Sequence, residues 1–370
     1  MQILLAIFYF FYFGIVGIYI IFMPKVLDMV GYDGSEIGII FAASPLVRFL
    51  LPFVFTKGFR LDARFFNISL LIMLIGAIGF YYSLESFYML FLSNIAVGIG
   101  MSLILPYIEV IALEKVGKES YGKVRLFGSV GFILVALVLV RFLTSPEVAL
   151  SYMLIFTFLT AIFAFFIARA DQKAKSKESE TSNDIALLSH WKLWLGLALM
   201  QVSFGAFYNF FTIYETSYGI SLDMTINLWV FGVIVEIFML YFQGRFLKFD
   251  LLLILKITTF SAVIRWFLLF MYPQNIGVLF FAQSLHALSF ALFYSASISY
   301  LHQLYSSKVL AQQFYSGITF GLGGFVGALM FGYIYEYFTS YIFLVASFVA
   351  LLSYISIHMW DRDVKRQSRA

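Results

Sequence analysis

Three ionisable side chains stand inside three consecutive apolar runs of the sequence. Glu236 lies within residues 224–244, Arg265 within 251–271 and His286 within 275–301. A lone charge in the hydrocarbon of a bilayer costs roughly 3 kcal/mol or more, so such side chains face a protein interior or a water-filled cavity. We therefore expect the three to line one polar site between helices.

The chemistry of this expected site follows from the residue types. Arg265 does not lose its charge, so it needs a carboxylate partner or an anionic ligand. Glu236 lies about one helical turn from it in membrane depth. Gln283 precedes His286 by three residues and shares its helix face. His286 is either a proton-exchanging group or a hydrogen-bonded interior residue, and the sequence leaves both interpretations open.

Further polar residues lie within other apolar runs. Glu109 is near the end of the run 87–113 and Arg125 is near the start of the run 121–143, at similar depth. The two either bind each other or alternate in holding a substrate group. Asn209 in the run 192–214 adds hydrogen-bonding capacity, although a single polar residue in such a run is weak evidence for a site.

The composition shows which elements must position these residues. Hydrophobic residues make up 62% of the 370 residues and charged residues 12%, which excludes a water-soluble globular protein. Apolar runs that continue for about 20 residues predict membrane-spanning helices rather than barrel strands. Twelve runs can be counted: 2–23, 36–56, 65–83, 87–113, 121–143, 149–169, 192–214, 224–244, 251–271, 275–301, 312–334 and 339–359.

The basic residues indicate how the chain crosses the membrane. Most of them fall in alternate short loops and in the two regions that flank the sixth and twelfth runs, whereas the opposite loops hold only Lys25 and Arg141. Because basic residues are retained on the cytoplasmic side, both termini are predicted to be cytoplasmic. The net charge of +4 is explained by this topology, so a lipid bilayer is the expected partner and nucleic acid is not.

A polar stretch at 171–190 divides the chain into two halves of six helices each. Its Lys, Glu, Ser and Asp content is typical of a solvated linker. We predict one six-helix bundle at 1–170, a second at 191–360 and a cytoplasmic tail at 361–370. When the Gly58 and Gly244 turns of the two halves are aligned, Arg48 matches the depth of Glu236. The two could form a pair between the halves that separates when the halves move, a static pair that holds the halves together, or two side chains that each have a local partner.

Several classes of site are not predicted. The sequence contains no Cys, and the four histidines have no close partner at metal-ligand spacing, so no metal is expected. No nucleotide-binding loop, nucleophile elbow or paired His-Glu motif is found, so neither a cofactor nor an enzyme is predicted. The glycine-rich run GLGGFVG places Gly323 and Gly327 at i, i+4, which favours close helix packing over phosphate binding.

Three sequence blocks resemble a known family. They are YGKVRLFGSVGFI at 121–133, the early IG…PLVRFLLP run with Arg48, and the series VIVEIFMLYF…GRF…VIRW…QSLHALSFA. Their order and spacing resemble the phenylpropionate permease family, which is related to the lactose permease and nucleoside/proton symporter groups of the major facilitator superfamily. The expected fold is thus an all-α membrane protein with two pseudosymmetric six-helix bundles.

The resemblance implies proton-coupled uptake of a small organic solute, with an aromatic carboxylic acid favoured and a nucleoside or sugar as the alternative. It implies that Glu109, Arg125, Glu236, Arg265 and His286 are functional polar residues, in a monomer of the cytoplasmic (inner) membrane. A sensor or interaction protein with the same fold is the alternative of another class.

Two positions depart from the related patterns. Ser289 stands where the lactose permease group has a carboxylate, so the proton carrier is expected elsewhere, at Glu236 or Glu109. The turn KGFRLDAR after the second run is a degenerate form of the superfamily's usual loop, although Asp62 within it could cap a helix.

Overall fold

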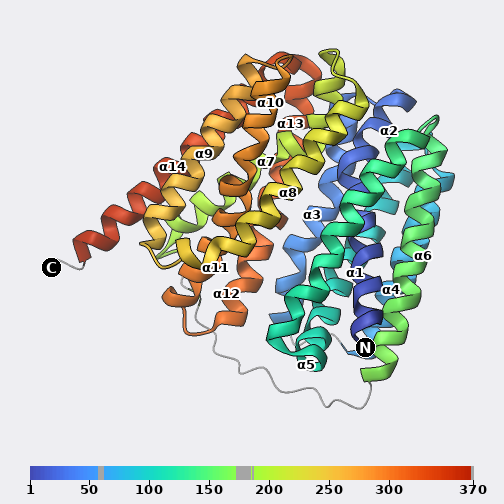
Figure 1. Cartoon of the computed structure of the whole chain (residues 1–370), viewed down its shortest axis with the longest axis horizontal. Coiled ribbons are helices and arrows are strands. Elements are labelled where there is room, and N and C mark those ends of the chain that lie inside the picture. Colours follow the sequence, from blue (N-terminus) through green and yellow to red (C-terminus); the bar gives the residue numbers. More distant parts are fainter. Residues whose placement is uncertain (57–61, 172–184, 186, 368–370) are drawn as a thin grey trace. The chain divides into compact units, whose positions relative to one another are not determined.

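The computed structural model describes residues 1–56, 62–171, 185 and 187–367. The chain divides into two compact units, Met1–Glu180 and Thr181–Ala370. In Figure 1 the helices α1 to α6, coloured blue to green, form the first unit, and α7 to α14, yellow-green to red, form the second. All elements in the described residues are helices.

The first unit consists of six crossings. In the first of them, the π-helical segment η1 (Ile18–Phe22) joins α1 (Gln2–Gly17) to α2 (Met23–Val30), and Pro24 stands in the first turn of α2. Proline has no amide hydrogen, so the helix loses one hydrogen bond there, and the π-helical turn stands directly before it. The other helices are α3 (Gly34–Thr56), α4 (Ala63–Tyr82), α5 (Phe87–Phe142) and α6 (Pro146–Asp171).

The helix α5 is two crossings rather than one. Gly117 lies inside it with φ of 73° and ψ of 163°, so the chain turns there, and a side chain would strain this conformation. The two parts, Phe87–Gly117 and Tyr121–Phe142, are each long and apolar enough to cross a membrane. They correspond to the two apolar runs predicted at 87–113 and 121–143.

The second unit is also built of helices, two pairs of which are joined by π-helical segments. Its helices are α7 (Trp191–Ser217), α8 (Leu222–Phe246), α9 (Leu251–Met271), α10 (Ile276–Ser284), α11 (Phe293–Leu304), α12 (Lys308–Tyr315), α13 (Gly324–Phe338) and α14 (Ile342–Gln367). The π-helical segments η2 (Ala287–Leu292) and η3 (Ser316–Gly323) join α10 to α11 and α12 to α13.

Eleven stretches of the described residues are long and apolar enough to span a membrane. The last of them, Leu310–Gln367, has 58 residues, which at 1.5 Å per residue is far longer than the roughly 30 Å that one crossing needs. The short 3-10 turn η4 (Thr339–Tyr341) divides it between α13 and α14. The predicted all-helical membrane fold with twelve crossings is therefore confirmed, and α14 continues to Gln367, past the predicted start of the tail.

Two local predictions can be compared with the structure. The carboxylate of Asp62 caps α4 by accepting hydrogen bonds from the amides of Arg64 and Phe65. The preceding residues of the KGFRLDAR turn, 57–61, lie outside the described residues, as does most of the linker predicted at 171–190. The bundle boundaries at 170 and 191 stay a prediction.

The glycines of the eleventh crossing bring it close to α7. A Cβ added at Gly327 would lie 2.8 Å from the carbonyl oxygen of Val202, and one added at Gly323 would lie 2.8 Å from that of Ala198. Neither distance leaves room for a methyl group, so glycine is required for this approach of backbones. The close packing holds α7 in place beside α13 and so fixes the aromatic face described below.

Candidate functional site

Arg265 on α9 is the centre of a polar cluster in the second unit. Its side chain is 0% exposed. One terminal nitrogen lies 2.8 Å from Nδ1 of His286 and 3.4 Å from Oγ of Ser289, and the other donates to Oε1 of Gln283 at 2.8 Å. The residues come together because η2, which begins directly after His286, packs against both α8 and α9.

The hydrogen bonds determine the state of the His286 ring. A guanidinium group can only donate, so Nδ1 of His286 accepts and carries no proton. The proton of the neutral ring is then on Nε2, which lies 3.4 Å from Oε2 of Glu236 on α8. The geometry describes a chain of donors that runs from Arg265 through His286 to Glu236.

Aromatic rings surround the guanidinium group of Arg265. Its Cζ lies 4.4 Å from the ring centre of Phe207, 4.5 Å from that of Trp266 and 5.6 Å from that of Phe204. Cation–π contacts of this kind stabilise a desolvated charge. Among the described residues no carboxylate lies within ion-pair distance of Arg265, and its Nε is buried without a hydrogen-bond partner. The sequence argument required a carboxylate or an anionic ligand for Arg265, and here the partners are neutral.

The three ionisable side chains of this cluster differ in their exposed fraction. The side chain of Glu236 is 23% exposed and that of His286 is 8% exposed, whereas Arg265 is sealed. Glu236 is therefore the most accessible of the three and Arg265 the least. The sequence placed Glu236 and Arg265 one turn apart but did not place His286 between them.

A second cluster lies in the first unit. Arg125 Nε is 3.3 Å from Oε1 of Glu109, and the hydroxyl of Tyr121 donates to the same oxygen at 3.1 Å. The turn at Gly117 folds α5 back on itself, which is why residues 16 positions apart can meet. The guanidinium group also lies 4.1 Å from the ring centre of Phe13 on α1. About a third of each charged side chain is exposed, so this cluster is not sealed as Arg265 is.

The remaining predicted residues join neither cluster. Asn209 donates from its amide to the carbonyl oxygen of Gly205 on its own helix, at 2.9 Å. Arg48 on α3 is half-buried and forms no ion pair within the described part of the chain. The pairing of Arg48 with Glu236 between the two halves stays a prediction.

Sequence reasoning missed three groups of residues. Ser289 was noted only as a lost carboxylate, yet its hydroxyl contacts Arg265. The rings of Tyr9 and Phe13 beside Arg125 were not distinguished from the many aromatic residues of a membrane protein. Glu215 is a buried acid that the predicted span 192–214 left just outside the membrane. A slightly longer predicted helix would have included it.

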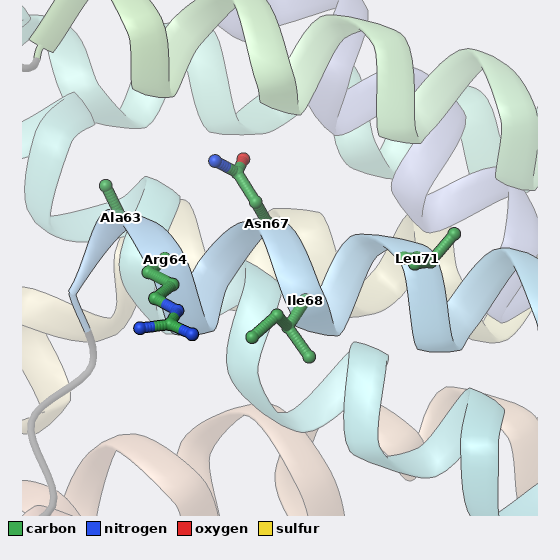
Figure 2. A pocket seen from close by; sticks show the side chains of 5 residues that line it. All are labelled: Ala63, Arg64, Asn67, Ile68 and Leu71. Atoms are coloured by element: carbon green, nitrogen blue, oxygen red, sulfur yellow. The ribbon is translucent and has the colours of Figure 1, made fainter.

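A hollow on the surface of the first unit lies at neither cluster. It has a volume of about 720 Å³ and is lined by one helix alone, α4, through Ala63, Arg64, Asn67, Ile68 and Leu71. In Figure 2 Asn67 points toward the pale green helix α6, whereas Arg64 and Ile68 point away from it. A hollow with walls from a single outer helix face does not enclose a solute, so we assign no site to it.

The comparisons with known proteins can now be set beside this geometry. Residues 2–345 match the model of the MFS_1 like family. The chain belongs to this family. It is 24% identical over 360 residues to the probable 3-phenylpropionic acid transporter of Escherichia coli (strain K12), with 94% of each chain covered. The resemblance to the phenylpropionate permease family is thereby confirmed.

Solved structures support the fold. The nucleoside transporter NupG superposes with a TM-score of 0.79 at 17% identity, covering 97% of this chain and 98% of NupG. The D-xylose-proton symporter superposes with a TM-score of 0.69 at 13% identity, covering 96% of each chain. The protein is thus a multi-pass membrane protein with the major facilitator fold, and relatives of it are named as transporters.

Proposed function

We propose that this protein is a secondary active transporter of the cytoplasmic membrane that takes up a small organic acid together with protons. It acts as a monomer with both termini in the cytoplasm. The observation that carries the proposal is the chain of donors from Arg265 through His286 to Glu236. Three ionisable groups on separate membrane helices serve no packing need that apolar side chains could not serve better.

An aromatic carboxylic acid is the substrate class that the chemistry favours. In the first unit the exposed guanidinium group of Arg125 supplies a partner for a carboxylate. The ring of Phe13, 4.1 Å from this group and only partly buried, supplies an apolar face for an aromatic ring. The relative from Escherichia coli is named for an acid of this kind, 3-phenylpropionic acid.

Glu236 is the first choice for the group that couples a proton to transport. Its Oε2 lies 3.4 Å from Nε2 of His286, and a proton on the carboxylate weakens this electrostatic contact. A change in this contact at the edge of a sealed cluster biases a balanced conformational equilibrium. Glu109, which has the corresponding bond to Arg125, is the second choice.

The test is uptake by the purified protein in proteoliposomes. With a pH gradient, acid outside, labelled 3-phenylpropionate should accumulate, and a protonophore should abolish accumulation. Glu236→Gln should lose the response to the gradient, whereas Asp223→Asn, at an exposed acid in the first turn of α8, should keep it. Gradient-driven uptake that survives in Glu236→Gln would exclude this residue as the coupling group.

The alternatives are outcomes of the same assay. A nucleoside such as uridine or a sugar such as xylose, offered in place of the acid, identifies the alternative substrate classes. A protein that binds one of these compounds in a thermal-shift assay without any flux in proteoliposomes would be a sensor rather than a transporter, and the proposal would be rejected.

A further inference from the structure

Glu215 is a buried carboxylate that belongs to neither of the two polar clusters. It lies in the last turn of α7 and is 0% exposed. Neither carboxylate oxygen has a hydrogen-bond partner, and no ion pair reaches it from the residues that the structure describes. The backbone fixes its position, because Gly219 ends the helix with φ of 87° and the amide of Ile220 bonds to the Glu215 carbonyl oxygen.

The helix face that carries Glu215 is aromatic. Phe211 is one turn before it on the same face and packs edge-on against Trp229 of α8, with ring centres 5.6 Å apart. The indole nitrogen of Trp229 donates to the hydroxyl of Thr212 at 3.0 Å and is therefore engaged elsewhere. The surroundings on this side supply apolar surface rather than donors.

No cation comes from the described residues of the elements that pack against this end of α7. The titratable groups there are Tyr214 and Tyr218 beside Glu215, Asp223 in the first turn of α8, and Tyr335 and Glu336 near the end of α13. On α14 the nearby residue is Phe343, which packs on Tyr214, and the charged residues of α14 lie at its other end. The segment η3 carries no charged residue.

An ionised carboxylate is incompatible with this environment. The effective cost of removing an ion from water without a partner is several kcal/mol, whereas a neutral polar group left unpaired costs about 1–3 kcal/mol. Glu236 is different, because it has a donor in His286 and is partly exposed. Among the described residues Glu215 has neither feature, so its closed surroundings favour the neutral acid.

We propose that Glu215 is a proton-binding site whose protonation permits the end of α7 to close. The idea rests on the proposed alternating-access function, in which this end opens to water and closes again. When it is open, the hydrated carboxylate takes a proton from the water at that membrane face and forms an O–H bond. Closure then buries a neutral acid, and reopening returns the proton to the same water, so this step moves no net proton across the membrane.

The site lies far from the start of α7. Glu215 is the 25th residue of the helix counted from Trp191, which places it about 36 Å along the axis. With both termini in the cytoplasm, this is the extracellular end. The proposal therefore predicts that acid outside the cell favours the state in which the outer end is closed.

The first experiment detects the bound proton directly. Infrared difference spectra of the full-length protein in nanodiscs, wild type minus Glu215→Gln at pH about 7, should show a carbonyl band of a protonated carboxylic acid, although glutamate is ordinarily ionised at this pH. The band should shift in D₂O. Asp223→Asn, the control at an exposed acid, should leave the band in place. A difference spectrum with only carboxylate bands would overturn the proton site, whether or not the protein transports anything.

The second experiment measures closure with two single-thiol variants of this cysteine-free chain. Thr225→Cys places the thiol at a buried position near the start of α8, and Ser217→Cys places it at an exposed position after Glu215. The labelling rate of the Thr225→Cys variant by a membrane-impermeant maleimide is divided by that of the Ser217→Cys variant, which corrects for the pH dependence of the thiol itself. We expect this ratio to fall by about tenfold from pH 8 to pH 5, and to be low and independent of pH when Glu215→Gln is added to both variants.

A ratio that still depends on pH in the Glu215→Gln background would overturn the role in closure. If the Thr225→Cys variant is unlabelled at every pH, the outer end does not open, which contradicts both the closure role and the proposed alternating access. The infrared band decides separately whether the proton is bound.

Discussion

Nε2 of His286 lies 3.4 Å from the carboxylate of Glu236, and the other nitrogen of the same ring faces a guanidinium group. Because Arg265 can only donate, this relationship defines the tautomer of His286 and places the ring proton on the side of Glu236. A single imidazole thus lies between a partly exposed acid and a sealed arginine.

His286 can be replaced in two ways that separate support of Arg265 from the link to Glu236. In His286→Asn the amide oxygen can still accept from Arg265, but the shorter side chain does not reach Glu236. We expect a thermal unfolding midpoint near that of the wild type and loss of gradient-driven uptake. His286→Ala removes the acceptor as well and should destabilise the protein by about 1–3 kcal/mol. Equal stability of the two variants would show that Arg265 does not depend on the ring.

The Glu109–Arg125 pair predicts a contrast between stability and transport. Glu109→Gln keeps an oxygen that can accept from Tyr121 and loses the charge. Since the side chains of Glu109 and Arg125 are about a third exposed, the pair contributes only about 0–1 kcal/mol to stability, and the unfolding midpoint should hardly change. Uptake of 3-phenylpropionate should fall at least about tenfold if the pair holds substrate. A loss of stability without a loss of uptake would assign the pair a structural role.

Close packing of α7 against α13 predicts an effect of a single methyl group. Gly327→Ala places a Cβ 2.8 Å from the carbonyl oxygen of Val202, and the resulting shift of two helices should cost about 1–3 kcal/mol. Gly244→Ala is the matched control, because a Cβ there meets nothing within 4 Å. Its stability should equal or slightly exceed that of the wild type. Thermal unfolding in detergent, followed by intrinsic fluorescence, compares the two.

A hydrogen-bond network at the start of α7 predicts a dependence of stability on pH. The hydroxyl of Tyr305 accepts from the indole nitrogen of Trp194 at 3.0 Å, and its own proton is available for Nδ1 of the neutral His190 ring, 2.8 Å away. Burial lowers the pKa of His190, and the neutral ring that accepts this bond is the form present in the folded state. In the unfolded chain the pKa of His190 has its ordinary value of about 6.5. Below that pH the unfolded chain binds more protons than the folded chain, so the free energy of unfolding falls as the pH decreases through this value.

The measurement for His190 is the unfolding midpoint at pH about 7.5 and about 5.5. The wild type should lose stability at the lower pH, and His190→Asn, whose amide does not titrate, should lose less. An equal loss in both proteins would assign the effect to other groups. The substitution lies outside the membrane-spanning helices, so transport at neutral pH should be retained.

The sequence predicted the number and type of membrane crossings correctly because these depend on local properties. A run of about 20 apolar residues has few alternatives to a membrane helix. The turn at Gly117 and the short turn at Thr339–Tyr341 appeared in the sequence only as breaks between apolar runs, at 113–121 and 334–339. Helix ends were less accurate, and the residues that the prediction left out at the end of α7 include Glu215.

The partners of the ionisable residues could not be predicted in the same way. Depth along a helix follows from counting residues, but direction around the axis depends on how neighbouring helices are rotated. The π-helical segment after His286 also changes the directions of the side chains that follow, because its turns are wider than those of an α-helix. Depth alone suggested Glu236 as the partner of Arg265, whereas His286, Gln283 and Ser289 occupy that position.

The sequence by itself determined that this protein crosses the membrane in twelve helices and that Glu236, Arg265 and His286 lie within them, because hydrophobicity and residue order are properties of the chain alone. Only the tertiary structure decided that His286 lies between the other two, that Glu109 meets Arg125 across a turn, and that Glu215 has no partner among the described residues. These relationships depend on the distances and orientations between helices that are set by side-chain packing, which no single segment specifies.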